Sequence, residues 1–134
     1  MKIVINIARF IAAIILLQTL YFKFTAAPES VYIFSKLGME PVGRIATGIA
    51  ELIAALLLLF PATASIGALI AVGLMSGAIF FHLSILGIEV MGDDGLLFIY
   101  GLLVMMCSIL VLVFHPGKIF DKLPFLTAYF NNEK

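Results

Sequence analysis

Residues 43–61 read GRIATGIAELIAALLLLFP. Between Gly43 and Pro61 every residue is apolar or small except Arg44, Thr47 and Glu51. The stretch is close to the ~20 residues with which a helix crosses the hydrocarbon core of a bilayer. Because a carboxylate inside lipid is costly, the sequence predicts a membrane helix whose Glu51 is stabilised by polar groups from other helices.

The composition places the whole chain in the membrane. Of its 134 residues, 63% are hydrophobic and 12% are charged, and the mean hydropathy is +1.21. Soluble domains have an apolar share of roughly 45–50%. Basic and acidic residues are balanced at 8 each, which gives no indication of a nucleic-acid partner. The lipid bilayer is therefore the expected surrounding.

Four apolar stretches predict an all-α integral membrane protein, a bundle of four transmembrane helices in a single domain over residues 1–134. Backbone groups in lipid must be satisfied within their own segment, which requires helices. Val31, Phe34 and Leu37 recur near helical spacing and predict a short interfacial helix between the first and second spans. Asp93 or Asp94 is placed to cap the last helix. The predicted spans are 3–24, 43–60, 64–88 and 95–114, followed by a tail over 115–134.

Four retained spans place both termini on one side of the membrane. A cleaved signal peptide is the alternative for the first span, but Arg9 within it and Lys23 after it fit that pattern poorly. By the positive-inside rule the termini and the tail are expected in the cytoplasm. The residues compared are Lys2, Arg9, Lys118, Lys122 and Lys134 on the terminal side and Lys23, Lys36 and Arg44 on the other.

Polar residues from different spans share one depth in the outer half of the membrane. At ~1.5 Å of rise per residue, Glu51 lies roughly 12 Å from the outer end of its helix, and His82 and Tyr100 lie about 9 Å from theirs. Lys23 ends the first span on the same side, and side chains lean toward a helix N-terminus, so Lys23 and Glu51 can converge. Gln18 has a similar depth but projects about 140° away from Lys23. We expect these five residues to form a polar pocket.

Small residues predict tight packing around Glu51. Gly48, Ala54 and Ala55 lie one turn from it, Ala46, Ala50 and Ala54 form a ridge beside it, and the third span carries Gly73 and Gly77 at a small-xxx-small spacing.

Each polar residue also has a simpler interpretation. Lys23 can snorkel to the headgroups, Glu51 can hold the helices together, His82 can be a packing residue and Tyr100 an interface aromatic. Arg9 is expected to be an anchor at the inner leaflet.

Several chemistries are disfavoured by the sequence. Cys107 is the only cysteine, so an intramolecular dithiol mechanism is excluded. His82 and His115 fall on opposite sides of the membrane and cannot ligate one haem, and His82 has no second histidine nearby for a metal site. No nucleotide-binding or hydrolase motif is present. We therefore expect no catalytic residues, no metal and an accessory protein more than an enzyme.

The chain resembles the DoxX and DoxX-like group of small four-helix membrane proteins, in the wider set that includes MauE. The resemblance covers Arg9 to about Phe114. Its carriers are LYFKF (20–24), YIFSKLGMEPVGRIATGIAELIAALLLLFP (32–61), MSGAIFFHL (75–83) and GDDG (92–95), and the most specific part is the Gly48 to Glu51 step together with Lys23.

The resemblance implies a bacterial inner-membrane protein. The group takes its name from a small subunit of a terminal quinol oxidase, its members are commonly linked to redox partners or oxidative stress, and a distant eukaryotic branch resembles assembly chaperones for acetylcholine receptors. The disulfide chemistry of MauE-type relatives is not carried over, because the paired cysteines are missing.

Three functions are left open by these residues. The first is an accessory subunit of a membrane redox or stress system, with a membrane oxidoreductase or another membrane protein as its partner. Its polar pocket would bind a quinone, a lipid or a partner helix, and His82 and Tyr100 would donate hydrogen bonds to a quinone carbonyl. The second is an assembly or scaffold protein in which the charges only join helices. The third is a small transporter or proton relay, which four helices would form only as a homo-oligomer.

Overall fold

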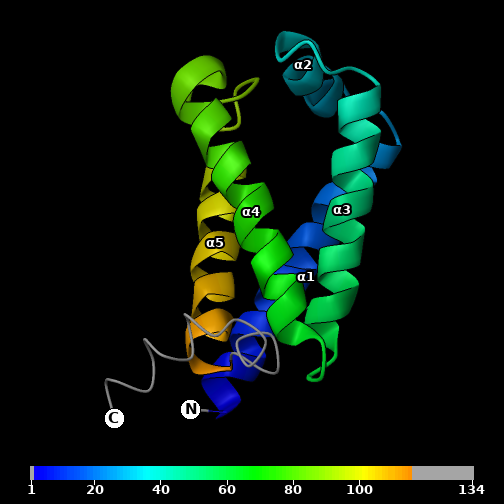
Figure 1. Cartoon of the computed structure of the whole chain (residues 1–134). Helices are drawn as coiled ribbons and strands as arrows, with labels where there is room; N and C mark the ends of the chain where they lie inside the picture. The colour runs from blue at the N-terminus through cyan, green and yellow to red at the C-terminus, as the bar shows by residue number, and fades with distance from the viewer. Residues whose placement is uncertain (1, 116–134) are drawn as a thin grey trace, which may run out of the picture.

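The computed structural model describes residues 2–115 and is a bundle of membrane helices (Figure 1). Four helices within this range are long and apolar enough to cross a membrane. The four-helix prediction is therefore confirmed, and so is the short helix between the first and second spans. The elements are α1 (Lys2–Phe24), α2 (Pro28–Lys36), α3 (Val42–Leu59), α4 (Ala64–Phe81), η1 (His82–Leu86) and α5 (Leu96–Phe114).

Residues 2 and 115 lie at the same end of the bundle. Lys2 and His115 line one small hollow there, and the opposite end carries α2 (Figure 1). We call these the terminal end and the α2 end. The predicted tail beyond His115, with Lys118, Lys122 and Lys134, lies outside the described residues.

The outward face of the bundle is apolar. Ile3, Phe10 and Ile14 on α1 are exposed, as are Leu103 and Met106 on α5. Such a surface would be unfavourable in water, and it matches the lipid tails of a bilayer. The bundle is therefore constructed for membrane surroundings.

Small residues bring α3 and α4 together near the turn that joins them. A Cβ atom added to Gly67 would lie 2.7 Å from the carbonyl oxygen of Ala54 and 2.7 Å from the backbone nitrogen of Leu58, so only glycine allows this approach. Ala54 and Ala68 are fully buried in the same region. From this contact the two helices diverge toward the α2 end (Figure 1).

Arg9 is a buried cap for α3 and not an anchor at the membrane surface. Its side chain is 4% exposed. Nε donates to the carbonyl oxygen of Leu58 at 2.9 Å, one terminal nitrogen donates to that of Leu59 at 2.8 Å, and the other donates to Asn6 Oδ1 at 2.7 Å. A cation at a helix C-terminus is favoured by the helix dipole and satisfies carbonyls that have no partner within the helix. The prediction of a leaflet anchor was wrong, because sequence spacing does not show which carbonyls an arginine can reach.

Asp93 closes the turn before α5. Its carboxylate accepts hydrogen bonds from the backbone N–H groups of Val90, Gly95 and Leu97, at 3.0, 2.8 and 3.2 Å. Partial burial alone would raise the pKa of Asp93, but these three backbone donors lower it below its ordinary value. Of the two aspartates predicted as a cap, Asp93 therefore fills the role.

Candidate ligand pocket

A cavity of about 270 Å³ lies where α3 and α4 diverge. Its walls come from all four spanning helices, from η1 and from α2, whose Ile33 and Phe34 close it at the α2 end. The cavity is partly open, and Gly73 on α4, which lines it, is exposed.

The packing predicted around Glu51 forms on one side only. Gly48, Ala54 and Ala55 are buried, and a Cβ atom at Gly48 would lie 2.9 Å from the Phe24 ring. On the α4 side, Cβ atoms added to Gly73 and Gly77 would meet nothing within 4 Å. The expectation that these two glycines pack against a helix was wrong. They border the cavity, because α3 and α4 touch at Gly67 near the turn and diverge from there toward the α2 end.

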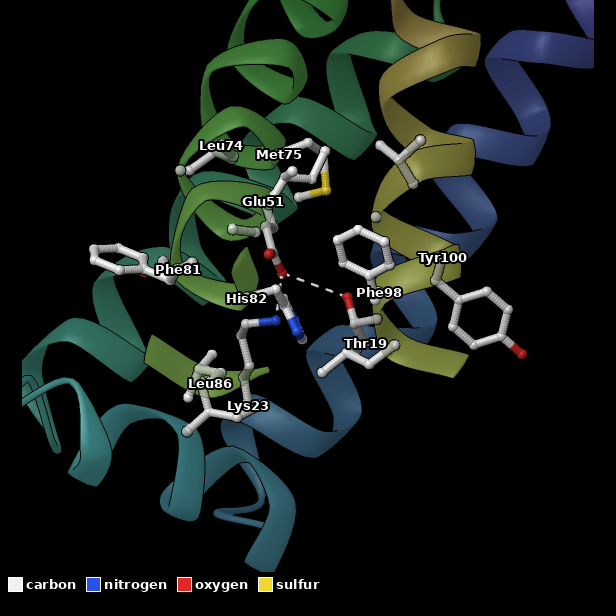
Figure 2. Close-up of a pocket in the computed structure, with 18 of the residues that line it drawn as sticks. Thr19, Lys23, Glu51, Leu74, Met75, Phe81, His82, Leu86, Phe98 and Tyr100 are labelled. Carbon is white, nitrogen blue, oxygen red and sulfur yellow. Dashed lines mark hydrogen bonds and ion pairs between the residues drawn. The ribbon is translucent and has the colours of Figure 1, made fainter. Parts of the chain in front are cut away.

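Lys23 and Glu51 form an ion pair on the wall of the cavity. Lys23 Nζ lies 3.0 Å from Glu51 Oε2, and the two side chains are 13% and 5% exposed (Figure 2). The pair joins the end of α1 to the middle of α3. Arg44, itself paired to Glu40 at 2.8 Å, donates to the backbone carbonyl of Lys23 and holds the end of α1 in place. The convergence of these two charges agrees with the directions in which their helices run.

Thr19 joins the site, although the sequence analysis did not include it. Its hydroxyl lies 3.4 Å from Glu51 Oε2 and 2.9 Å from the carbonyl oxygen of Leu16 (Figure 2). One hydroxyl proton serves one acceptor well, and the shorter distance favours Leu16. The signal was available, since Thr19 precedes Lys23 by four residues and lies on the same helix face.

His82 is buried at the junction of α4 and η1 and lines the cavity. Its Nδ1 lies 2.9 Å from the carbonyl oxygen of Gly87, and its ring meets Phe98 edge-on with centroids 5.6 Å apart. A carbonyl oxygen only accepts, so Nδ1 carries a proton and donates it. In the neutral ring Nε2 is then an acceptor.

The remaining two predicted residues are placed differently. Tyr100 lines the cavity, but its hydroxyl points away from Lys23 and Glu51 (Figure 2). Gln18 is exposed on the outside of α1 and does not line the cavity. The structure thus brings together Lys23, Glu51 and His82, adds Thr19, and leaves Gln18 outside. A helix-wheel angle of about 140° was already unfavourable for Gln18.

The cavity combines apolar walls with one polar cluster. Leu74, Met75 and Phe81 are among the residues that form the apolar part, and the polar residues come from α1, from α3 and, with His82, from η1. Such a lining suits a molecule with a small polar head and an apolar body. Within residues 2–115, no three His, Cys, Asp or Glu side chains gather to hold a metal ion.

The fold and the pocket define a small multi-pass membrane protein with an internal polar site. The family model of the DoxX-like family matches residues 7–113, and the chain belongs to that family. Comparisons with curated proteins and with solved structures give no match.

Proposed function

We propose that this protein binds an amphipathic molecule taken from the bilayer, a quinone or a lipid, in the pocket beside Lys23 and Glu51. The observation that carries the proposal is an ion pair, almost fully withdrawn from the surroundings, on the wall of a largely apolar and partly open cavity. A pair needed only to join two helices requires no cavity beside it. The cavity supplies the space that a ligand needs.

The size of the cavity is consistent with a ring-sized head. An apolar cavity of about 150 Å³ holds benzene, and pockets for drug-sized ligands start near 300 Å³. At about 270 Å³ this cavity has room for a substituted ring, and because the cavity is partly open an apolar tail would extend out of it. The tail would then remain in lipid, which avoids exposing it to water.

The biological setting proposed for this binding is an accessory role in a redox or stress system of the inner membrane. The resemblance of the sequence to redox-linked members supports it, and a membrane oxidoreductase is the partner it suggests. The distribution of Lys and Arg supports cytoplasmic termini. In that arrangement the pocket would be nearer the outer face.

Gly77→Leu tests the proposal by filling the cavity. The helix gains a better helix former, and no neighbouring atom lies within 4 Å of the added Cβ. Ala46→Leu is the matched control, because Ala46 is exposed on α3 and does not line the cavity. The variants would be purified in native-lipid nanodiscs and their organic extracts compared by mass spectrometry.

The proposal predicts a quinone or lipid enriched with the wild type and with Ala46→Leu and lost from Gly77→Leu, at equal thermal stability. The same extract composition for all three proteins would refute it. Titration with decylbenzoquinone and with its quinol, followed by native mass spectrometry, gives a second readout that does not depend on what the cells supplied.

A scaffold role is the second candidate, supported by the chain of contacts from Glu40 through Arg44 and Lys23 to Glu51 that ties α1 to α3. Under this role Glu51→Gln lowers the amount of folded protein, and cellular function falls in proportion. Loss of function at full abundance would contradict it.

A transporter or proton relay finds less support in a single chain. Leu58 and Val111 are fully buried near the terminal end of the bundle, where a path from the pocket across the membrane would have to run. Proton flux into liposomes reconstituted with the protein, measured with a pH-sensitive dye, would revive this function.

A further inference from the structure

We propose that the pocket selects a neutral head that donates a hydrogen bond, such as a phenolic hydroxyl, over heads that only accept. This inference rests on the proposed function, namely that an amphiphile binds beside Lys23 and Glu51. It reverses the sequence-based expectation that the protein would donate to a quinone carbonyl. The reason lies in which donors and acceptors remain free at the cavity wall.

Two acceptors at the wall are unused. Glu51 Oε2 faces Lys23, while Glu51 Oε1 has no hydrogen-bond partner among the described residues. His82 donates through Nδ1 to Gly87, and its Nε2 has no partner among residues 2–115 either. Within that range Ser108 Oγ is the only side-chain nitrogen or oxygen that is completely buried and also has no hydrogen-bond partner. Glu51 Oε1 and His82 Nε2 therefore keep open surface, and the cavity is the space beside both residues.

The supply of donors is smaller. The Thr19 hydroxyl is directed at the carbonyl of Leu16, and the hydroxyl of Tyr100 points away from the ion pair (Figure 2). Lys23 is the remaining donor, with three N–H bonds of which Glu51 takes one. The wall thus offers two acceptors and one ammonium group. A hydroxyl can donate to one of these acceptors and accept from Lys23 through the same oxygen, whereas a carbonyl or ether oxygen can only accept.

Charge restricts the head further. The ammonium of Lys23 and the carboxylate of Glu51 compensate each other, so the pair presents no net charge to a ligand. A phosphate or carboxylate head would bring an uncompensated charge to a depth where lipid surrounds the protein. A quinone or an ether would enter without charge but would leave Glu51 Oε1 and His82 Nε2 without a donor, which is unfavourable in a low-dielectric site.

Three probes of nearly equal size separate these cases. They are 4-hexylphenol, its methyl ether 4-hexylanisole, and 4-hexylbenzoate, titrated into the full chain in nanodiscs of neutral lipid and followed by calorimetry at pH 7. Each probe is also titrated into Gly77→Leu to subtract partitioning into lipid. The expected result is that the phenol binds at least ten-fold more tightly than the ether, about 1.4 kcal/mol, and that the benzoate binds more weakly than the phenol.

Equal affinities for phenol and ether, both abolished by Gly77→Leu, would overturn this inference and leave the proposed function standing. No binding of any probe would overturn the proposed function and this inference with it. Glu51→Gln supplies a further check, because an amide nitrogen at the Oε1 position donates and should reduce the preference for phenol over ether. The wild-type comparison decides the question even if this variant does not fold.

Discussion

The Lys23–Glu51 pair should be strongly coupled in stability. At 3.0 Å and an effective dielectric constant of about 20, Coulomb's law gives an attraction of ~5.5 kcal/mol. Withdrawing both charges from water opposes this gain, so the pair need not be a large net source of stability. Removing one partner is different, because it leaves the other charge nearly buried and unpaired. Such a change costs about 3–5 kcal/mol.

A double-mutant cycle measures this coupling. Lys23→Met and Glu51→Gln are each expected to lower the free energy of unfolding by about 3–5 kcal/mol. The loss in the double variant is expected to be smaller than the sum of the two single losses. For a chain of this size the single variants should lower Tm by roughly 10–20 °C. Loss of helical circular dichroism on heating in mild detergent is the assay.

Lys36→Met is the control. Lys36 is exposed on α2 and interacts with Tyr32 at the surface, so its removal should change stability by less than about 0.5 kcal/mol. Single losses from Lys23→Met and Glu51→Gln that add within about 0.5 kcal/mol would show that the two charges are independent. That result would refute the ion pair and the pocket built around it.

Three further predictions concern the frame of the bundle. Gly67→Val should destabilise the protein by more than about 2 kcal/mol, because the added side chain overpacks against backbone atoms. Gly73→Ala should be neutral or stabilising, because its Cβ enters open space, and equal Tm values for the two variants would contradict the contact between α3 and α4. Arg9→Met should cost roughly 2–4 kcal/mol, since the carbonyls of Leu58 and Leu59 at the end of α3 lose a charged donor. A change below about 0.5 kcal/mol in chemical unfolding would argue against the cap. Asp93→Asn should cost about 1 kcal/mol above pH 5. Because folding lowers the pKa of Asp93, its contribution is complete above its ordinary pKa and is lost as the pH falls through the lowered value, so the wild type and Asp93→Asn should converge in Tm in strong acid; a gap that is independent of pH would exclude this origin.

Part of the candidate site was predictable because it depends on properties of single helices. The depth of a residue follows from its distance along the span, and the direction of its side chain follows from the direction of its helix. These rules placed Lys23 beside Glu51 and His82 on the same cavity. The same rules could have placed Thr19 at the cavity, because it lies one turn before Lys23. They could also have excluded Gln18, which lies on another face of the helix.

The cavity itself was not predictable in this way. Four glycines within the spanning helices look equivalent in the sequence but differ in the structure. Gly48 and Gly67 contact a neighbouring ring or helix, whereas Gly73 and Gly77 border open space. The difference depends on the angle at which α3 and α4 diverge. For the same reason Arg9 turned out to cap a helix whose last two residues are 49 and 50 residues away along the chain.

The sequence by itself determined that the chain lies in a membrane as four helices, because apolar length and the obligatory hydrogen bonding of the backbone leave no other spanning structure. It also determined the height at which the charges meet. Only the tertiary structure decided which small residues form contacts and which leave space, and which polar atoms remain free beside that space. These properties arise from the relative placement of helices, and periodicity within one helix carries no information about the distance to the next.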